Sequence, residues 1–320
     1  MHNCFLKVLR RVASKNSVPQ TINFFKMKKI LKCSGIILLM VCSYAANAQI
    51  QENEKQYLIK LNKSTQGFKW KNEWNLNANP ATWHGVEVKD GHVVSLKLYR
   101  NNLEGKIPEG ISVLKKLETL NLSFNLLEGE LPQGLFELQE LKSIKLEMNK
   151  LSGEMPQDYS KMKKLEELTM FNNLLQGSIP SGIGSLENLK TLNLSSNYFD
   201  GRLPKSLENL KKLERLELFG NKLAGSIDVE LGKLVHLKEL ILSYNQFEGD
   251  LPSSIASLSN LEFVQLQGNG FRSLNSLLRL ESTKLAVFDS DDEFLNMKFS
   301  TNELSKSRLA DTKYEDVKQN

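Results

Sequence analysis

The side chains that could carry out catalysis are few in this sequence, and they are not grouped. Only three histidines follow residue 48, namely His84, His92 and His236. A hydrolytic site needs a nucleophile, a base and an orienting group, yet no HExxH, CxxC, phosphate-binding loop or Ser/His/Asp order occurs. Single carboxylates recur at Glu147, Glu167, Glu217 and Glu239. They are more simply polar contacts than a catalytic pair, so we expect neither enzymatic activity nor a cofactor.

Metal chemistry is also poorly supported. The acidic run DSDDE at residues 289–293 supplies oxygen ligands, but it lacks the glycine and the closing glutamate of an EF-hand calcium loop. A solvated edge of the fold is the better interpretation. Cys4, Cys33 and Cys42 are the only cysteines, and all precede residue 49. We therefore expect neither a metal site nor a disulfide in residues 49–320.

Aromatic and methionine side chains are better candidates for a binding site, because they recur just before regularly spaced asparagines. They are Tyr99, Phe124, Met148, Phe171, Phe219 and Tyr244. With Arg215, Glu217 and Glu239 they fit the anchors and charged flanks of a protein or peptide interface. Phe171 and Phe219 would lie about 10 Å apart if one repeat is one strand wide, with Ser195 between them. The alternative is that the rings only shield the asparagines.

One repeated pattern positions all of these residues. The pattern L-x-x-L-x-L-x-x-N-x-L-x-G-x-I-P returns every 24 residues. Its asparagines are Asn101, Asn125, Asn149, Asn173, Asn197, Asn221, Asn245 and Asn269. Such self-similarity predicts a solenoid in which stacked coils share one core.

Each position of the pattern has a physical task. The leucines should point inward from a short strand, and successive strands should form a parallel sheet. The asparagine amide can donate and accept hydrogen bonds where the chain turns, so stacked asparagines would satisfy neighbouring turns. Glycine permits the turn, and proline fixes an extended return segment. Asp228 replaces the proline in one coil, and the sequence offers no reason for it.

The repeat resembles the plant-type leucine-rich repeat of receptor-kinase ectodomains and secreted polygalacturonase inhibitors. The resemblance covers residues 70–275 and includes Trp74-Asn75, Pro80 and residues 83–86, WHGV, which are similar to an N-terminal element of that family. Ala81 and Val88 stand where the family has cysteines, so this cap must rely on apolar packing. The resemblance implies a right-handed horseshoe with a parallel β-sheet on its concave face and short irregular or 3₁₀ segments on its convex side. It also implies partner binding on the concave or lateral face, and no chemistry.

The repeats are expected to be closed by a cap at each end. Residues 49–92 would form the N-terminal cap, with an amphipathic helix within residues 52–70 whose apolar side chains are Tyr57, Leu58, Leu61 and Phe68. Trp70, Trp74 and Trp83 suit a lid over the first coil, although such a cluster can also be a ligand platform. Eight repeats would fill residues 93–275. Residues 276–299 would form the C-terminal cap, because Leu285 and Phe288 keep the phase of Leu261 and Val264 and so predict a degenerate ninth strand.

The two ends of the chain have a different composition. Residues 27–48 resemble a signal peptide, with lysines, an apolar run and Ala46-Asn47-Ala48, while Lys32 leaves too few apolar residues for a membrane span. We expect export after cleavage near Ala48 to the periplasm, the cell surface or the medium, with lipoprotein processing at Cys42 as the weaker alternative. Residues 1–26 are interpreted as a start codon assigned too early, or else as a targeting extension. Residues 300–320 are expected to be a flexible polar tail.

The charge distribution narrows the choice of partner. The net charge is +5, but eight of the 42 Lys and Arg lie in residues 1–48, which contain no acid, and the remaining 34 are outnumbered by 37 acidic residues. A nucleic-acid partner is therefore not expected. Lysine pairs at 115–116, 163–164 and 211–212 alternate with Gln139-Glu140 and Glu187-Asn188, which indicates solvation, with an anionic polysaccharide partner as the alternative.

These features together predict a non-enzymatic, secreted recognition module that binds a protein or peptide through the concave face of its repeats. Glycan binding or cell-surface adhesion is the alternative. The bacterial style of the signal peptide, beside a plant-type repeat, indicates a bacterial protein.

Overall fold

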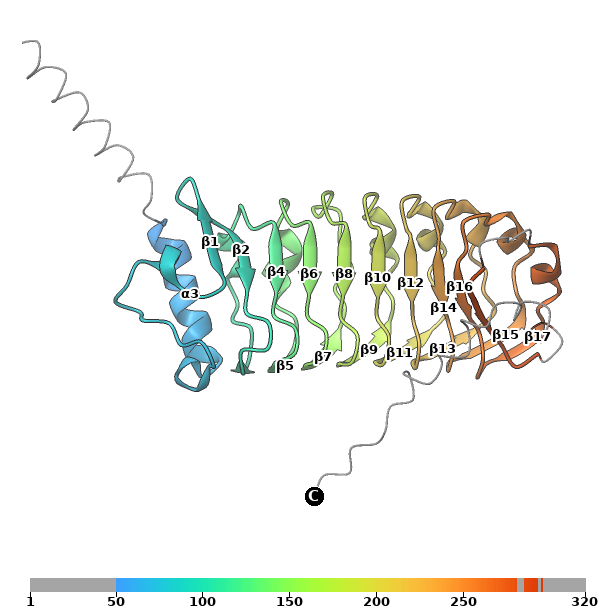
Figure 1. Ribbon diagram of the computed structural model, residues 1–320, viewed down its shortest axis with the longest axis horizontal. Coiled ribbons are helices and arrows are strands. Elements are labelled where there is room, and N and C mark those ends of the chain that lie inside the picture. The colour runs from blue at the N-terminus through green and yellow to red at the C-terminus, as the bar shows by residue number, and fades with distance from the viewer. Residues whose placement is uncertain (1–49, 281–284, 293–294, 296–320) are drawn as a thin grey trace, which may run out of the picture. The chain divides into compact units, whose positions relative to one another are not determined.

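Each 24-residue repeat folds into one coil of a stack, and equivalent strands of successive coils lie side by side (Figure 1). The computed structural model describes residues 50–280, 285–292 and 295. The extension and signal peptide predicted for residues 1–48, and the tail predicted for residues 300–320, lie outside this part of the chain. In the described part, none of the helices has the length and apolar character needed to cross a membrane.

A ten-stranded sheet covers one side of the stack. Its strands, in spatial order, are β1 (Val86–Lys89), β2 (His92–Lys97), β4 (Thr119–Asn121), β6 (Ser143–Lys145), β8 (Glu167–Thr169), β10 (Thr191–Asn193), β12 (Arg215–Glu217), β14 (Glu239–Ile241), β16 (Phe263–Gln265) and β18 (Val287–Asp289). β1 pairs antiparallel with β2, and the other pairings are parallel with a register of 24 residues. β18 places Phe288 beside Val264, the register that the sequence predicts for a ninth strand.

The return side of the coils is more regular than the sequence predicts. It contains a second parallel sheet of eight short strands where only irregular or 3₁₀ segments were expected. These strands are β3 (Glu104–Gly105), β5 (Leu126–Gly129), β7 (Lys150–Glu154), β9 (Leu174–Ser178), β11 (Tyr198–Gly201), β13 (Lys222–Gly225), β15 (Gln246–Asp250) and β17 (Gly270–Ser273). The repeat glycine is needed here, because Gly153 has a φ of 84° and a Cβ on it would lie 2.8 Å from Glu130 Cγ.

Short 3₁₀ helices complete the coils. They are η1 (Gly67–Lys69), η2 (Pro80–Thr82), η3 (Ile111–Val113), η4 (Gln133–Glu137), η5 (Ser181–Ser185), η6 (Lys205–Asn209), η7 (Leu231–Lys233), η8 (Ser253–Ser257) and η9 (Asn275–Arg279). The coil between β7 and β8, at residues 155–166, is fully described and has no such helix. In the coil of Asp228, the exposed Asp228 carboxylate accepts hydrogen bonds from Arg202 and Ser226, and η7 has only three residues.

The core is one apolar column that runs through all the coils. The three repeat leucines of one coil, Leu117, Leu120 and Leu122, have no exposed surface. Phe199 and Phe247 are equally buried where other coils use leucine. The predicted inward positions are therefore confirmed, and the core is continuous from the N-terminal cap to Leu295.

The asparagine side chains bridge neighbouring coils. Asn173 Oδ1 accepts the backbone N–H of Leu151, 3.0 Å away in the preceding coil, and its Nδ2 donates to the carbonyl oxygens of Leu146 and Met170 at 3.0 Å. The same hydrogen bonds recur with a 24-residue offset from Asn125 to Asn245. Each side chain thus ties the turn of its own coil to the coil before it.

The N-terminal cap joins aromatic packing to a buried carboxylate. Trp74 packs edge-on against Trp70 and stacks on Trp83, with 4.8 Å between ring centroids in both pairs. α3 (Glu52–Ser64) buries Tyr57, Leu58 and Leu61, but it ends before Phe68, which is 73% exposed, so the prediction that Phe68 belongs to its apolar face is wrong. The buried Glu54 is a feature that sequence reasoning missed.

Glu54 provides a hydrogen-bond acceptor for the backbone at the start of the repeat sheet. Its carboxylate accepts the backbone N–H of Val93 at 2.7 Å and contacts His92 Nδ1 at 2.7 Å. At the other end, Asp291 Oδ2 accepts the backbone N–H of Gly268 at 2.8 Å and of Asn269 at 3.4 Å. One member of the acidic run 289–293 therefore continues the asparagine hydrogen bonding into the C-terminal cap.

Replacing a central asparagine should weaken the whole stack. Asn173→Ala leaves the Leu151 N–H without its partner and removes one of the two asparagine hydrogen bonds that the Leu146 and Met170 carbonyl oxygens each accept. The free energy of unfolding should therefore fall by about 2–4 kcal/mol in urea denaturation. Asn209→Ala, at an exposed position in η6, is the control and should change it by less than about 0.5 kcal/mol. Equal losses in the two variants would contradict this role of Asn173.

The N-terminal cap should depend on Glu54. Glu54→Ala strands the buried N–H of Val93 and should lower the free energy of unfolding by about 1–3 kcal/mol. The exposed neighbour Glu52→Ala serves as the control in the same thermal or chemical melt. A loss no larger for Glu54 than for Glu52 would show that the cap does not rely on this carboxylate.

Candidate functional site

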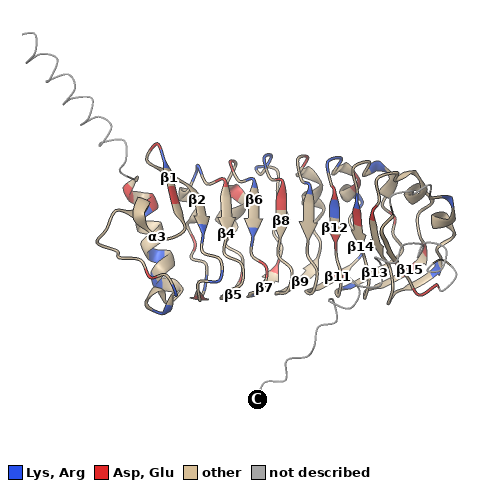
Figure 2. Cartoon of the chain, viewed as in Figure 1, with Lys and Arg blue, Asp and Glu red and all other residues tan. Residues whose placement is uncertain are grey.

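The outward side chains of the ten-stranded sheet, together with those of the turn that follows each strand, form what we call the sheet face. Both signs of charge occur along it (Figure 2). The structure divides the predicted aromatic residues of this face into two groups. In the first group, Tyr99 and Phe124 meet edge to face at 5.3 Å, and the Arg100 guanidinium lies 5.7 Å and 5.4 Å from their ring centroids.

The second group surrounds a hollow in the C-terminal half of the sheet face. This C-terminal hollow has a volume of about 1010 Å³. Its lining residues come from the ends of β8 to β18 and the turns beside them: Phe171, Asn172, Asn193, Ser195, Ser196, Glu217, Phe219, Gly220, Ile241, Tyr244, Gln265, Gln267 and Asp289. Phe219 and Tyr244 meet edge to face at 5.3 Å, and Phe171 lies on the far side of Ser195. Four of the nine predicted partner-binding residues thus lie around one hollow.

The backbone at the turns explains how these rings are presented. In all eight repeats the residue just before the ladder asparagine has a positive φ. These residues are Arg100, Phe124, Met148, Asn172, Ser196, Gly220, Tyr244 and Gly268. A side chain larger than glycine costs about 1–2 kcal/mol in this conformation. Sequence reasoning missed this feature, although the glycines and the asparagine at this position could have indicated it.

Glu217 is the titratable group of the C-terminal hollow whose environment differs most from water. Its carboxylate accepts a hydrogen bond from Asn193 Nδ2 at 2.7 Å. Burial, followed by repulsion from Glu239, raises the pKa of Glu217 from its usual 4.5 to about 7, and Arg215 offsets part of this effect. Arg215 itself donates to the hydroxyl of Thr191 at 3.0 Å and 3.3 Å. Burial and the nearby Asp291 also raise the pKa of Asp289.

Other polar side chains of the sheet face are used internally. The Glu147 carboxylate is buried and accepts the hydroxyl of Thr169 at 2.6 Å. Glu167 pairs with Lys145 at 2.8 Å and accepts the hydroxyl of Ser143 at 2.8 Å. Glu147 and Glu167 therefore bind side chains of neighbouring coils, whereas the Glu217 side chain lines the C-terminal hollow.

Charged side chains at the edge of the stack pair from one coil to the next. Lys163 contacts Glu187 at 3.1 Å, and Lys212 donates to Asn188 Oδ1 at 2.7 Å. These contacts confirm the interleaving of opposite charges expected from the lysine pairs. Because the pairs are exposed, each contributes under about 1 kcal/mol, and they provide no concentrated cationic surface.

Groups that could hold a metal are not assembled in the described residues. No group of three or more His, Cys, Asp or Glu has the arrangement of a metal site among them. His92 is bound to Glu54, while His84 and His236 are exposed and distant in sequence.

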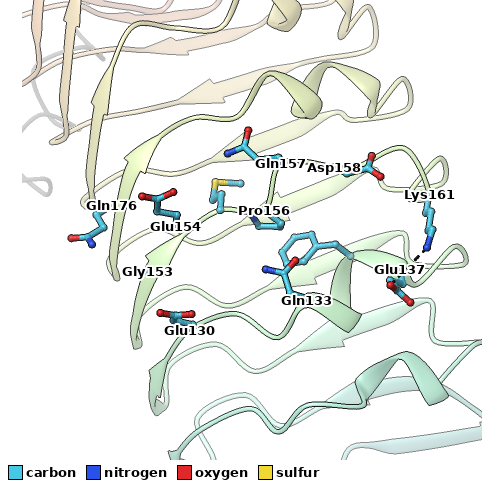
Figure 3. A pocket seen from close by; sticks show the side chains of 12 residues that line it. Glu130, Gln133, Glu137, Gly153, Glu154, Pro156, Gln157, Asp158, Lys161 and Gln176 are labelled. Atoms are coloured by element: carbon cyan, nitrogen blue, oxygen red, sulfur yellow. Dashed lines mark ion pairs between the residues drawn. The ribbon is translucent and has the colours of Figure 1, made fainter.

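A second hollow, of about 760 Å³, lies on the return side, where the coil between β7 and β8 lacks a 3₁₀ helix (Figure 3). It is lined by acidic and amide side chains such as Glu130, Glu154 and Gln157, and Lys161 pairs with Glu137 at 3.8 Å. Phe136 packs beneath it against the buried Tyr159 at 5.3 Å. Because its aromatic side chains are buried, it offers no anchor, and we assign it no binding role.

Comparison with known proteins identifies the repeats. Residues 92–228 match the leucine-rich repeat region family, and residues 236–258 match the leucine-rich repeat family. The described part of the chain is therefore a leucine-rich-repeat solenoid, and its repeats follow the plant-type consensus.

Solved structures give the same fold. The ectodomain of the Arabidopsis thaliana receptor kinase GASSHO1/SCHENGEN3, in complex with CASPARIAN STRIP INTEGRITY FACTOR 2, is 27% identical with a TM-score of 0.62, over 74% of this chain and 32% of that one. The Arabidopsis receptor kinase HAESA, in complex with the peptide hormone IDA and the co-receptor SERK1, is 27% identical with a TM-score of 0.60, over 75% and 46%. A leucine-rich-repeat protein of Leptospira interrogans is 33% identical with a TM-score of 0.51, over 59% and 46%. The chain thus spans less than half of each of these structures.

The buried carboxyl of Glu217 should make stability depend on pH. A carboxyl group whose pKa is raised in the folded state holds its proton more tightly there, so stability is lost as pH rises from about 4.5 to 7. Glu217→Gln removes this loss, so the variant should be more stable than the wild type at pH 8, by on the order of 1–3 kcal/mol, and nearly equal to it at pH 4.5. Urea denaturation at the two pH values measures the difference.

Glu248→Gln, at an exposed position on β15, is the matched control and should show no such change with pH. A Glu217→Gln effect of the same size at both pH values would mean that ionisation of Glu217 is not the cause.

Proposed function

We propose that this protein is a non-enzymatic recognition module that binds a protein or peptide segment on its sheet face. The observation that carries the proposal is the C-terminal hollow, where Phe171, Phe219 and Tyr244 remain partly or largely exposed around a concave surface. Aromatic side chains are enriched at the anchors of protein interfaces, and solenoids offer extended surfaces of this kind. The remaining predicted contacts, Tyr99, Phe124, Met148, Arg215 and Glu239, would extend the interface along the same face.

The known structures support a polypeptide partner. The two plant receptors named above were solved with CASPARIAN STRIP INTEGRITY FACTOR 2 and with the peptide hormone IDA. A peptide laid along several coils would contact more than one aromatic group, which would give affinity without a deep pocket.

Export also belongs to the proposal. The composition of residues 27–48 resembles that of a signal peptide, and the similar plant structures are of receptor kinases, one of them explicitly an ectodomain. The similarity to a Leptospira protein supports a bacterial origin. The expected location is the periplasm, the cell surface or the medium.

Glycan binding is the second candidate, and one observation favours it. Phe171 and Phe219 line the same hollow, with Ser195 between them, as a groove for a sugar ring would require. Against it, Phe219 and Tyr244 meet at 68°, so they do not offer one flat platform on which a ring could stack. We therefore rank a polypeptide partner first.

Removing two rings tests the proposal. A pull-down with residues 49–320 from cells or medium should capture a polypeptide, and Phe171→Ala with Phe219→Ala should weaken its affinity by about tenfold or more, because each anchor contributes more than about 1 kcal/mol. Tyr198→Ala is the matched control, since this exposed tyrosine lies on β11, away from the sheet face.

Partner binding and shielding of the asparagines predict different effects of the ring substitutions on stability. A loss of unfolding free energy well above about 0.5 kcal/mol per site would assign Phe171 and Phe219 to shielding the asparagines. Saturable binding of a glycan without any bound polypeptide would reverse the ranking of the two functions.

A further inference from the structure

The C-terminal hollow is lined by carboxylates and aromatic rings, and Arg215, the nearby positive charge that acts on Glu217, is not among its lining residues. Glu217 on β12 and Asp289 on β18 both line it, three strands apart. Among the described residues that line the hollow there is no Lys, Arg or His. A ligand that enters this hollow therefore meets two acidic groups of the chain and no basic one.

Glu217 is partly buried without an ion-pair partner, so an incoming cation would stabilise its ionised form. Its hydrogen-bond partner is the neutral amide of Asn193, 2.7 Å away. Arg215, two residues earlier on the same strand, directs its guanidinium to the Thr191 hydroxyl, and Glu239 on β14 adds a second negative charge nearby. A carboxylate that has lost water without gaining an ion pair gains more from a cation than an exposed one does.

The aromatic rings are arranged to pack on the stem of such a cation. Phe219 meets Tyr244 edge to face, and the Tyr244 ring lies so close to Gly268 that a Cβ there would be 2.9 Å from its Cδ1 atom. These contacts fix two of the rings before any ligand arrives. Lys and Arg pack their methylene stems on apolar surfaces, and aromatic faces attract their charged groups.

We propose that the C-terminal hollow receives a lysine or arginine side chain of the bound polypeptide. Glu217 accepts hydrogen bonds from its charged group, Asp289 adds negative charge further along the same hollow, and the aromatic rings beside Glu217 pack on its stem. The inference rests on the proposed function, to which it adds the charge of the anchor residue.

Peptide pools with a fixed central residue test the inference. The probes are random heptapeptides, acetylated at the N-terminus and amidated at the C-terminus, so that only the side chains carry charge. The central residue is Lys, Arg, norleucine, citrulline or Glu, which changes charge while keeping length or shape similar. Retention on the immobilised full chain at pH 8 is measured by mass spectrometry, and the Lys and Arg pools should be retained about tenfold or more over the norleucine and citrulline pools.

Two variants test whether the preference for Lys and Arg arises in the C-terminal hollow. The double variant Glu217→Gln with Asp289→Asn should lose the preference for Lys and Arg, and Glu248→Gln should keep it, because Glu248 is exposed on β15. In the wild type the preference should grow between pH 5.5 and 8, as Glu217 ionises near Arg215 and Glu239, in a hollow that also contains Asp289 and the phenol of Tyr244. In the double variant it should not change with pH.

The outcomes separate this inference from the function on which it rests. If the norleucine and lysine pools are retained equally, and Phe171→Ala with Phe219→Ala abolishes both, the cation inference is overturned while peptide binding stands. A preference for Lys and Arg that survives in the double variant also overturns it. Retention of none of the pools overturns both the inference and peptide binding at this hollow.

Discussion

The hydrogen bonds of the asparagine side chains are the constraint on which the rest of the structure depends. Each coil is too thin to bury a core alone, so it must lie in register with its neighbours. One amide per coil achieves this, because its oxygen accepts an N–H of the preceding coil while its nitrogen donates to carbonyl groups of both coils. In the two caps, carboxylates take over this role, because Glu54 accepts the buried N–H of Val93 and Asp291 accepts the N–H of Gly268.

This constraint also decides where the chain is free to vary. Leucine, glycine and asparagine positions are fixed by packing and turn geometry, so the outward strand positions and the turn residues are left for recognition. At the turns the backbone requires a positive φ, and yet Phe124 and Tyr244 occupy positions where glycine would be less strained. Retaining a ring there has an energetic cost, and this is a physical reason to connect these side chains with binding.

Much of the fold could be predicted from the sequence, because the same inward leucines and turn residues recur every 24 residues. The inward leucines, the parallel register and the ninth strand at Phe288 were all accessible in this way. The end of α3 before Phe68 was not, because helical spacing alone does not show where a helix stops. Glu54 and Asp291 were missed because their roles depend on contacts outside the repeat. The Asp90-Gly91 turn between β1 and β2 has a hairpin signal that could have been read.

The candidate site was less predictable, since spacing places side chains on one face without giving the shape between them. That Glu217 is desolvated, or that Tyr244 lies against Gly268, follows from three-dimensional packing. The central claim remains the coupling of coils by asparagine, and amide hydrogen exchange of single residues tests it most directly. The amides of Leu127, Leu151, Leu175, Phe199, Leu223 and Phe247, which donate to the asparagine oxygens, should share one high protection that is lost only in global unfolding. Exchange of these amides at the rates of exposed loops, or at unrelated rates from coil to coil, would contradict the account.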